Sequence, residues 1–198
     1  MESQQILSGL PGLDCGSCGS PTCKALAEDG KRVILLDADL RKSALYNKCM
    51  PDQEVKGLSH YLAGFVPLND VICKTNIKNF YMAFAGLNAP NPAELLGNPK
   101  FKAAIEAMKK SFNYIIVDCA PIGAVIDAAV VAKSVDGMVM VIEQKKVSRR
   151  MAQKMKEQLE ASGCPLLGVI LNKVKISENK SYGGYGQYYG HYGKYGEY

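Results

Sequence analysis

The chain has 198 residues, of which 47% are hydrophobic, and a formal net charge of +5. This size allows one soluble domain with a full core, and no apolar run approaches the roughly 20 residues of a membrane span. The amino-terminal residues show no signal peptide. Seven cysteines in a chain without a signal peptide indicate a reducing compartment. We therefore expect a cytoplasmic protein. The modest charge gives nucleic-acid binding no support.

The first feature along the chain is a loop of closely spaced cysteines, Cys15, Cys18 and Cys23, with glycines between them. Such spacing lets one loop wrap its thiolates around an iron–sulfur cluster, which normally takes four cysteine ligands. Residues 10–29 resemble the cysteine loop of a small [4Fe–4S] domain, and the resemblance implies a cluster on these three thiols. The next cysteine, Cys49, lies beyond a predicted buried strand. The alternative is that the three thiols are reduced, partly buried side chains with no ligand.

Two apolar runs further along the chain end on carboxylates. Residues 33–36 are followed by Asp37 and Asp39, and residues 114–117 are followed by Asp118. Short unbroken apolar runs predict strands buried on both faces of a parallel sheet, and ligands bind at the carboxyl ends of such strands. We therefore expect the acids to converge where Mg²⁺ and phosphates are held. The alternative is that they cap helices or lie in solvated loops.

The remaining pattern alternates between strands and helices. After a strand at 80–85, Asn98 and Pro99 predict a helix start, followed by an apolar stripe at helical spacing. The later segments are strands at 114–118, 138–142 and 167–171 and helices at about 127–133 and 148–161. This order predicts an α/β fold with a doubly wound, mostly parallel sheet and right-handed crossovers.

Residues 182–198 form a low-complexity segment rich in tyrosine and glycine. Without aliphatic residues it cannot bury enough surface to offset its ordering entropy, so a flexible tail over residues 177–198 is predicted after a domain at 1–176. One interpretation of the tail is an aromatic segment that associates nonspecifically and has no role in an enzymatic reaction. The other is a set of phosphorylation sites, namely Tyr182, Tyr185, Tyr188, Tyr189, Tyr192, Tyr195 and Tyr198.

Several of these segments together resemble the bacterial tyrosine kinases, P-loop proteins that control capsule and exopolysaccharide export. Residues 30–42 are similar to the second Walker motif of that family, and residues 118–123 to its Walker B segment. Further matches are Gly57-Leu58-Ser59, residues 90–96, Asp127-Ala128-Ala129, Val135-Asp136-Gly137, Ser148-Arg149-Arg150 and the tyrosine-rich tail. The resemblance covers about residues 30–198 and implies the fold of a P-loop NTPase.

One motif of that family is missing from the chain. A P-loop needs G-x-x-x-x-G-K-[ST], because glycine amides cradle the phosphates, the lysine neutralises their charge and the hydroxyl binds Mg²⁺. Lys24 does not fit this pattern, since Cys23 precedes it, Ala25 follows it and Cys18 stands where the first glycine belongs. The absence of this Walker A motif predicts weak ATP binding.

The resemblance also implies roles for particular residues in phosphate transfer from Mg-ATP to tyrosine. Asp37 would orient or deprotonate the tyrosine hydroxyl and contact Mg²⁺, with Asp39 as its partner, and Asp118 would be the Walker B contact to Mg²⁺. Arg41 would hold a phosphate or Asp39, or is a plain surface cation. Asn172 would contact adenine, or caps a loop.

The implied partners are a separate membrane-bound activator, at the inner face of the membrane, and further copies of the chain that phosphorylate one another. Three functions remain open. The chain is a tyrosine kinase domain that modifies its own or a neighbour's tail, a catalytically dead module that presents its tail for regulation, or an iron–sulfur protein.

Overall fold

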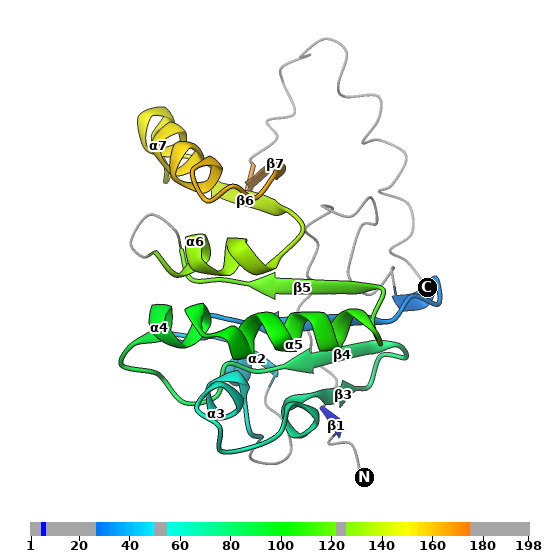
Figure 1. Cartoon of the computed structure of the whole chain (residues 1–198). Coiled ribbons are helices and arrows are strands. Elements are labelled where there is room, and N and C mark those ends of the chain that lie inside the picture. Colours follow the sequence, from blue (N-terminus) through cyan, green and yellow to red (C-terminus); the bar gives the residue numbers. More distant parts are fainter. Residues whose placement is uncertain (1–4, 7–26, 50–54, 122–125, 175–198) are drawn as a thin grey trace.

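The computed structural model describes residues 5–6, 27–49, 55–121 and 126–174 (Figure 1). Its elements in chain order are β1 (Gln5–Ile6), β2 (Val33–Asp37), α2 (Leu45–Cys49), α3 (Leu58–Leu62), the 3-10 helix η1 (Leu68–Val71), β3 (Cys73–Thr75), β4 (Phe80–Ala83), α4 (Pro92–Gly97), α5 (Pro99–Lys109), β5 (Tyr114–Asp118), α6 (Asp127–Val131), the 3-10 helix η2 (Ala132–Ser134), β6 (Met138–Glu143), α7 (Arg149–Glu160) and β7 (Leu166–Asn172). No helix within these ranges has the length and apolarity needed to cross a bilayer.

Strand β2 lies between β4 and β5, to both of which it runs parallel, and all five of its residues are buried. Successive side chains of a strand point to opposite faces. Ile34 and Leu36 join an apolar cluster with α3 and α5, whereas Val33 and Leu35 join a second cluster with α2. Helices therefore cover both faces of β2, as its unbroken apolar run predicts.

The α/β fold with a mostly parallel sheet is confirmed, and only β3 and β4 pair antiparallel among the described strands. The predicted helix start is also observed, since the Asn98 side chain accepts a hydrogen bond from the Lys100 N–H at 2.9 Å. Strand β4 ends earlier than predicted. The reason is that the Phe84 and Ala85 carbonyls accept hydrogen bonds from the first turn of α3.

The described strands form two sheets, one ordered β1-β3-β4-β2-β5 and one made of β6 and β7. One expectation about these strands is wrong. Strand β5 is not buried on both faces: Tyr114 is 39% exposed, Asp118 is exposed and residues 115–117 are half-buried. Strand β5 differs from β2 because it is an edge strand, which pairs with β2 alone among the described strands.

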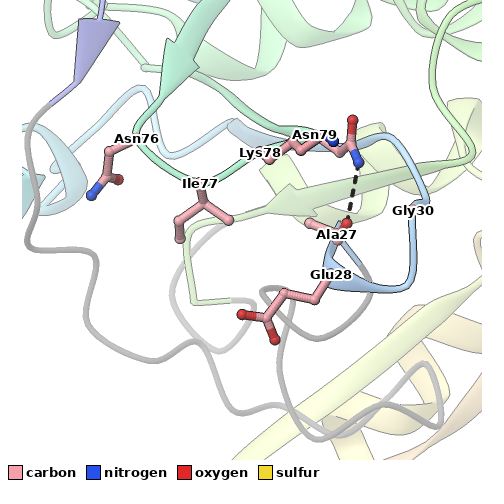
Figure 2. A pocket seen from close by; sticks show the side chains of 7 residues that line it. All are labelled: Ala27, Glu28, Gly30, Asn76, Ile77, Lys78 and Asn79. Carbon is pink, nitrogen blue, oxygen red and sulfur yellow. Dashed lines mark hydrogen bonds between the residues drawn. The ribbon is translucent and has the colours of Figure 1, made fainter.

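A cavity of about 570 Å³ lies at the opposite edge of the sheet from the carboxylates (Figure 2). Residues just before β2 and in the turn between β3 and β4 line it, and the Asn79 side chain donates to the Ala27 carbonyl at 3.3 Å. Because these residues precede their strands, the cavity is at the amino-terminal edge. It is separate from the expected site.

Helix α3 begins where two glycines are in contact. The Leu58 N–H donates to the Phe84 carbonyl at 2.7 Å, which brings the backbone of Gly57 against that of Gly86. A Cβ on Gly57 would lie 2.3 Å from the Gly86 nitrogen and 2.6 Å from the Phe84 oxygen. Only a residue without a side chain fits here, because backbone atoms cannot move aside cheaply.

We expect Gly57→Ala to destabilise the protein by about 1–3 kcal/mol, because the added methyl group forces α3 away from the end of β4. Urea unfolding followed by circular dichroism measures this change. The control is Gly168→Ala in β7, where a Cβ meets no atom within 4 Å. Equal stability of the two variants would show that the contact between Gly57 and Gly86 is loose.

Candidate active site

The predicted carboxylates lie at the carboxyl edge of two neighbouring strands. Asp37 is the last residue of β2 and Asp118 the last residue of β5, and the two are partners in the strand register. Asp37 is 1% exposed, whereas Asp118 is exposed. The structure thus brings these two acids together, with one buried and one facing solvent.

The Asp37 carboxylate is held by a set of donors. The Ser43 hydroxyl donates to one oxygen, the Asp39 N–H donates to the other at 3.2 Å, and the Ala85 backbone contributes a further hydrogen bond. Burial and, to a smaller extent, the Asp118 charge raise the pKa of Asp37, the hydrogen bonds lower it, and the net result is a pKa of about 6. A carboxyl with such a pKa exchanges a proton near neutral pH, which suits a general base.

Asp39 shapes the loop that follows β2. Its carboxylate accepts hydrogen bonds from the N–H groups of Arg41 at 3.1 Å and Lys42 at 3.0 Å. These bonds close a turn in which the Asp39 side chain stands in for a backbone acceptor. The turn carries the chain from Asp37 to Ser43, so that the hydroxyl returns to the Asp37 carboxylate.

Arg41 forms a two-point ion pair with Asp127, the first residue of α6. Its Nε donates at 2.7 Å and its Nη2 at 3.1 Å to the two carboxylate oxygens. The Asp127 side chain is 1% exposed and that of Arg41 is 40% exposed. The hydrogen bond to Asp127 raises the pKa of Arg41, so the guanidinium keeps its charge. The Arg41 guanidinium thus binds Asp127, whereas the Asp39 carboxylate binds Arg41 only through the backbone N–H of that residue.

The thiol of Cys119 lies close to several negatively charged carboxylates. Burial is the main cause that raises the pKa of Cys119 to about 12, and the smaller contributions come from the charges of four nearby carboxylates, Asp118, Asp127, Asp39 and Asp37. A thiol with this pKa stays protonated and is a poor nucleophile. The carboxylates therefore lie close enough together to act on one group.

This edge can hold a magnesium ion without a preformed cage. Within the described ranges, no group of three or more histidine, cysteine or acidic side chains is arranged around a metal position. Magnesium usually binds through one or two carboxylates together with water and phosphate oxygens. Asp37 and Asp118, as register partners, fit that requirement.

Among the described residues predicted for the site, Asn172 does not join this group. Asn172 ends β7 in the second sheet, where its side chain accepts a hydrogen bond from the Lys173 N–H at 2.8 Å, as a loop cap does. Cys15, Cys18, Cys23 and the tail tyrosines lie outside the described residues.

Two residues of the site, Asp127 and Ser43, were not predicted as site residues from the sequence. Asp127 stood out in sequence only as part of a family-like segment, and its partner Arg41 lies 86 positions away. Ser43 gave no signal beyond its place in the loop after the acids.

Comparisons with known proteins agree with this geometry. Residues 20–161 match the model of a family described as an AAA domain, and residues 10–29 match one described as a putative Fe-S cluster. The tyrosine-protein kinase CpsD of Streptococcus agalactiae is 44% identical over 153 residues, which cover 77% of this chain and 67% of that protein. The matched part thus spans about two thirds of the relative.

Solved structures give the same result. The kinase domain of the Escherichia coli tyrosine kinase ETK superposes with a TM-score of 0.76 at 30% identity, over 92% of this chain and 72% of that one. The septum site-determining protein MinD from Pyrococcus horikoshii, solved with Mg-ADP, gives a TM-score of 0.65 at 27% identity, over 88% and 71% of the two chains. The chain belongs to the bacterial tyrosine kinase family, within the P-loop NTPase fold.

Proposed function

We propose that this chain is a tyrosine kinase domain of capsule or exopolysaccharide synthesis, which transfers phosphate from Mg-ATP to tyrosines of its own or a neighbour's tail. The observation that carries the proposal is the pairing of buried Asp37 with exposed Asp118 at one edge of the sheet. The relatives named as tyrosine-protein kinases support it.

Each residue of the site has its own role in the proposed phosphate transfer. Asp37 accepts the proton of the tyrosine hydroxyl, and Asp39 fixes the loop that holds Asp37 in place. Asp118 and Asp37 would hold Mg²⁺, which neutralises phosphate charge when bound. Arg41 uses two of its five N–H donors on Asp127, and the others remain for a phosphate.

The missing Walker A motif limits this activity. Hydrogen bonds to charged groups contribute about 1.5–3 kcal/mol each. Loss of both the lysine and the hydroxyl ligand removes roughly 3–6 kcal/mol of transition-state stabilisation, or about two to four powers of ten in rate. We therefore propose weak self-phosphorylation by the chain alone, with a membrane-bound activator and further copies as its partners.

The kinase assignment predicts that Asp37→Asn and Asp118→Asn each abolish self-phosphorylation. Both changes keep the size of the side chain and remove the charge that takes the proton or holds Mg²⁺. Phosphate incorporation with radiolabelled ATP and phosphopeptide mapping measure this, and the modified tyrosines should lie within 182–198. Asp70→Asn, at an exposed site in η1 two strands away from β2, is the control.

An unaltered signal in both variants would contradict the assignment, as would modification mainly at the exposed Tyr46 or Tyr114. If the wild-type chain incorporates no phosphate but becomes phosphorylated by an added active homologue, it is the tail-presenting regulatory module instead.

The raised pKa of Asp37 predicts how stability depends on pH in magnesium-free buffer. Its pKa is about 6 in the folded protein against an ordinary 3.8, so the folded state binds more protons between these values. Stability is therefore lost as pH rises through this window, by up to about 3 kcal/mol. Asp37→Asn removes the effect.

Urea unfolding at pH 4.5 and pH 7.5 tests the prediction. The difference in free energy of unfolding between Asp37→Asn and wild type should shift in favour of the variant by about 2 kcal/mol at the higher pH, because the unfolded carboxyl is already mostly ionised at pH 4.5. No shift, or a shift of opposite sign, would mean that Asp37 is already ionised at low pH in the folded state.

The match of residues 10–29 to a putative iron–sulfur family supports a second candidate function, cluster binding by Cys15, Cys18 and Cys23. Three thiolates leave one iron without a protein ligand, so anaerobic reconstitution should give a substoichiometric, oxygen-labile cluster. Visible absorption and iron analysis measure it, with Cys164→Ser as the control. Protein free of iron after reconstitution would rule the cluster out.

A further inference from the structure

Positive charge gathers at the carboxyl end of the second sheet. The turn after β6 has two lysines, the first two turns of α7 have three further cations, and one lysine follows β7. These residues are Lys145, Lys146, Arg149, Arg150, Lys154 and Lys173, all of them exposed. We call these six residues the basic cluster.

Ion pairs and strand pairing place the parts of this cluster next to one another. Glu143, the last residue of β6, pairs with Lys146 at 3.1 Å and with Lys173 at 3.2 Å. Its register partner on β7 is Asn172, whose carbonyl also accepts a hydrogen bond from the Gln144 N–H at 2.9 Å. Helix α7 starts directly after the turn that follows β6. The two strand ends and the start of α7 therefore form one surface.

The described structure balances few of these charges. Lys146 and Lys173 share the single carboxylate of Glu143, and the other four cations form no ion pair with a described residue. Arg149 and Arg150 also hold the first two positions of α7, and its first turn has no acidic residue. The helix dipole disfavours cations at this end of a helix. The basic cluster therefore favours the binding of an anion.

The chain itself has a segment that can reach this surface. Strand β7 ends at Asn172, Lys173 of the basic cluster follows, and the first tyrosine of the tail, Tyr182, comes nine residues after Lys173. Nine residues of extended chain span about 30 Å. A short tether of this kind keeps its end at an effective concentration on the order of millimolar. Even a weak attraction between the tail and the basic cluster would therefore be occupied.

Phosphate would give the tail the charge that the cluster attracts. The side chains of residues 177–198 include two glutamates and two lysines, so their charges cancel. Each phosphotyrosine adds about −1.5 to −2 charges and three acceptor oxygens. Tyr182 and Tyr185 lie three positions apart, so both phosphates would fall within about 10 Å of chain. Arginine and lysine bind phosphate through charge-assisted hydrogen bonds.

We propose that the basic cluster is the docking site of the chain's own tail once the tail tyrosines are phosphorylated. The docked tail is held on the chain that carries it and is withdrawn from neighbouring copies. Phosphate thus acts as a switch between a free and a docked tail. The inference rests on the proposed function only for the source of the phosphate, which an added kinase can also provide.

Fluorescence anisotropy with a labelled peptide of residues 181–186 tests the docking site. The peptide phosphorylated at Tyr182 and Tyr185 should bind the unmodified full chain, and the peptide without phosphate should bind about tenfold more weakly or less. Because the contact is electrostatic and exposed, about 0.5 M sodium chloride should weaken it by about tenfold as well. Equal binding of the two peptides would overturn the proposal.

Matched charge reversals locate the contact. Arg149→Glu combined with Arg150→Glu should weaken binding of the phosphopeptide about tenfold. The control is Lys100→Glu combined with Lys102→Glu, which also reverses two exposed cations in the first turn of a helix without acidic residues, here α5. The control should bind normally, and equal effects of the two double variants would overturn the proposal.

A second variant guards against a folding defect in α7. Lys145→Glu combined with Lys146→Glu changes only the turn before the helix and should also weaken binding of the phosphopeptide. Circular dichroism of each variant verifies that it is folded. Normal binding by both cluster variants would overturn the proposal.

The phosphorylated chain tests docking in the same molecule. Full chain treated with an added active homologue and Mg-ATP should bind the phosphopeptide about tenfold more weakly, because its own tail occupies the site, and phosphatase should restore binding. Unchanged binding would overturn the proposal, as would a loss of binding that depends on chain concentration, which indicates docking on a second copy.

Two further outcomes separate this inference from its alternatives. If the unmodified chain binds vesicles of anionic lipid through Arg149 and Arg150 but does not bind the phosphopeptide, the cluster is a membrane surface and the proposal is wrong. If the phosphorylated tail docks but the chain never phosphorylates itself, the docking site stands and the proposed kinase function is contradicted.

Discussion

The buried end of β2 is the constraint on which the rest of the structure depends. Residues 33–36 fill two apolar clusters on opposite faces of the sheet, and this burial brings Asp37 out of water at the last position of the strand. A carboxylate that is buried in that position needs hydrogen-bond donors to stabilise it. The loop through Asp39 and Ser43 provides them, as does the backbone of Ala85 after β4. The site is thus a consequence of how its central strand is buried.

The same edge shows what the proposed phosphate-transfer site lacks. Acidic side chains from three parts of the chain meet there, and the guanidinium of Arg41 uses two of its five N–H donors on Asp127, so that part of its positive charge is already neutralised. Carboxylates can take a proton and hold Mg²⁺, but they repel a triphosphate. The family relationship therefore accounts for the acids, while nucleotide affinity depends on groups that the described residues lack.

Much of this could be predicted from sequence, because it depends on local pattern. The apolar run of β2, the Asn98 cap of α5 and the convergence of Asp37 with Asp118 all follow from periodicity and from the geometry of parallel strands. The pair of Arg41 and Asp127 could not, since no spacing rule links residues 86 positions apart. The exposure of Tyr114 could not either, because it depends on what lies beyond β5 and not on the apolar run itself.

The most direct test of the account is a calorimetric titration of the full chain alone with Mg-ATP, with EDTA-treated protein as the reference. A chain that has the carboxylates but no phosphate cradle should bind far more weakly than micromolar, and the weak heat that remains should disappear without Mg²⁺. Binding at micromolar affinity or tighter would contradict the account, because it would require a phosphate-binding loop already present within these 198 residues.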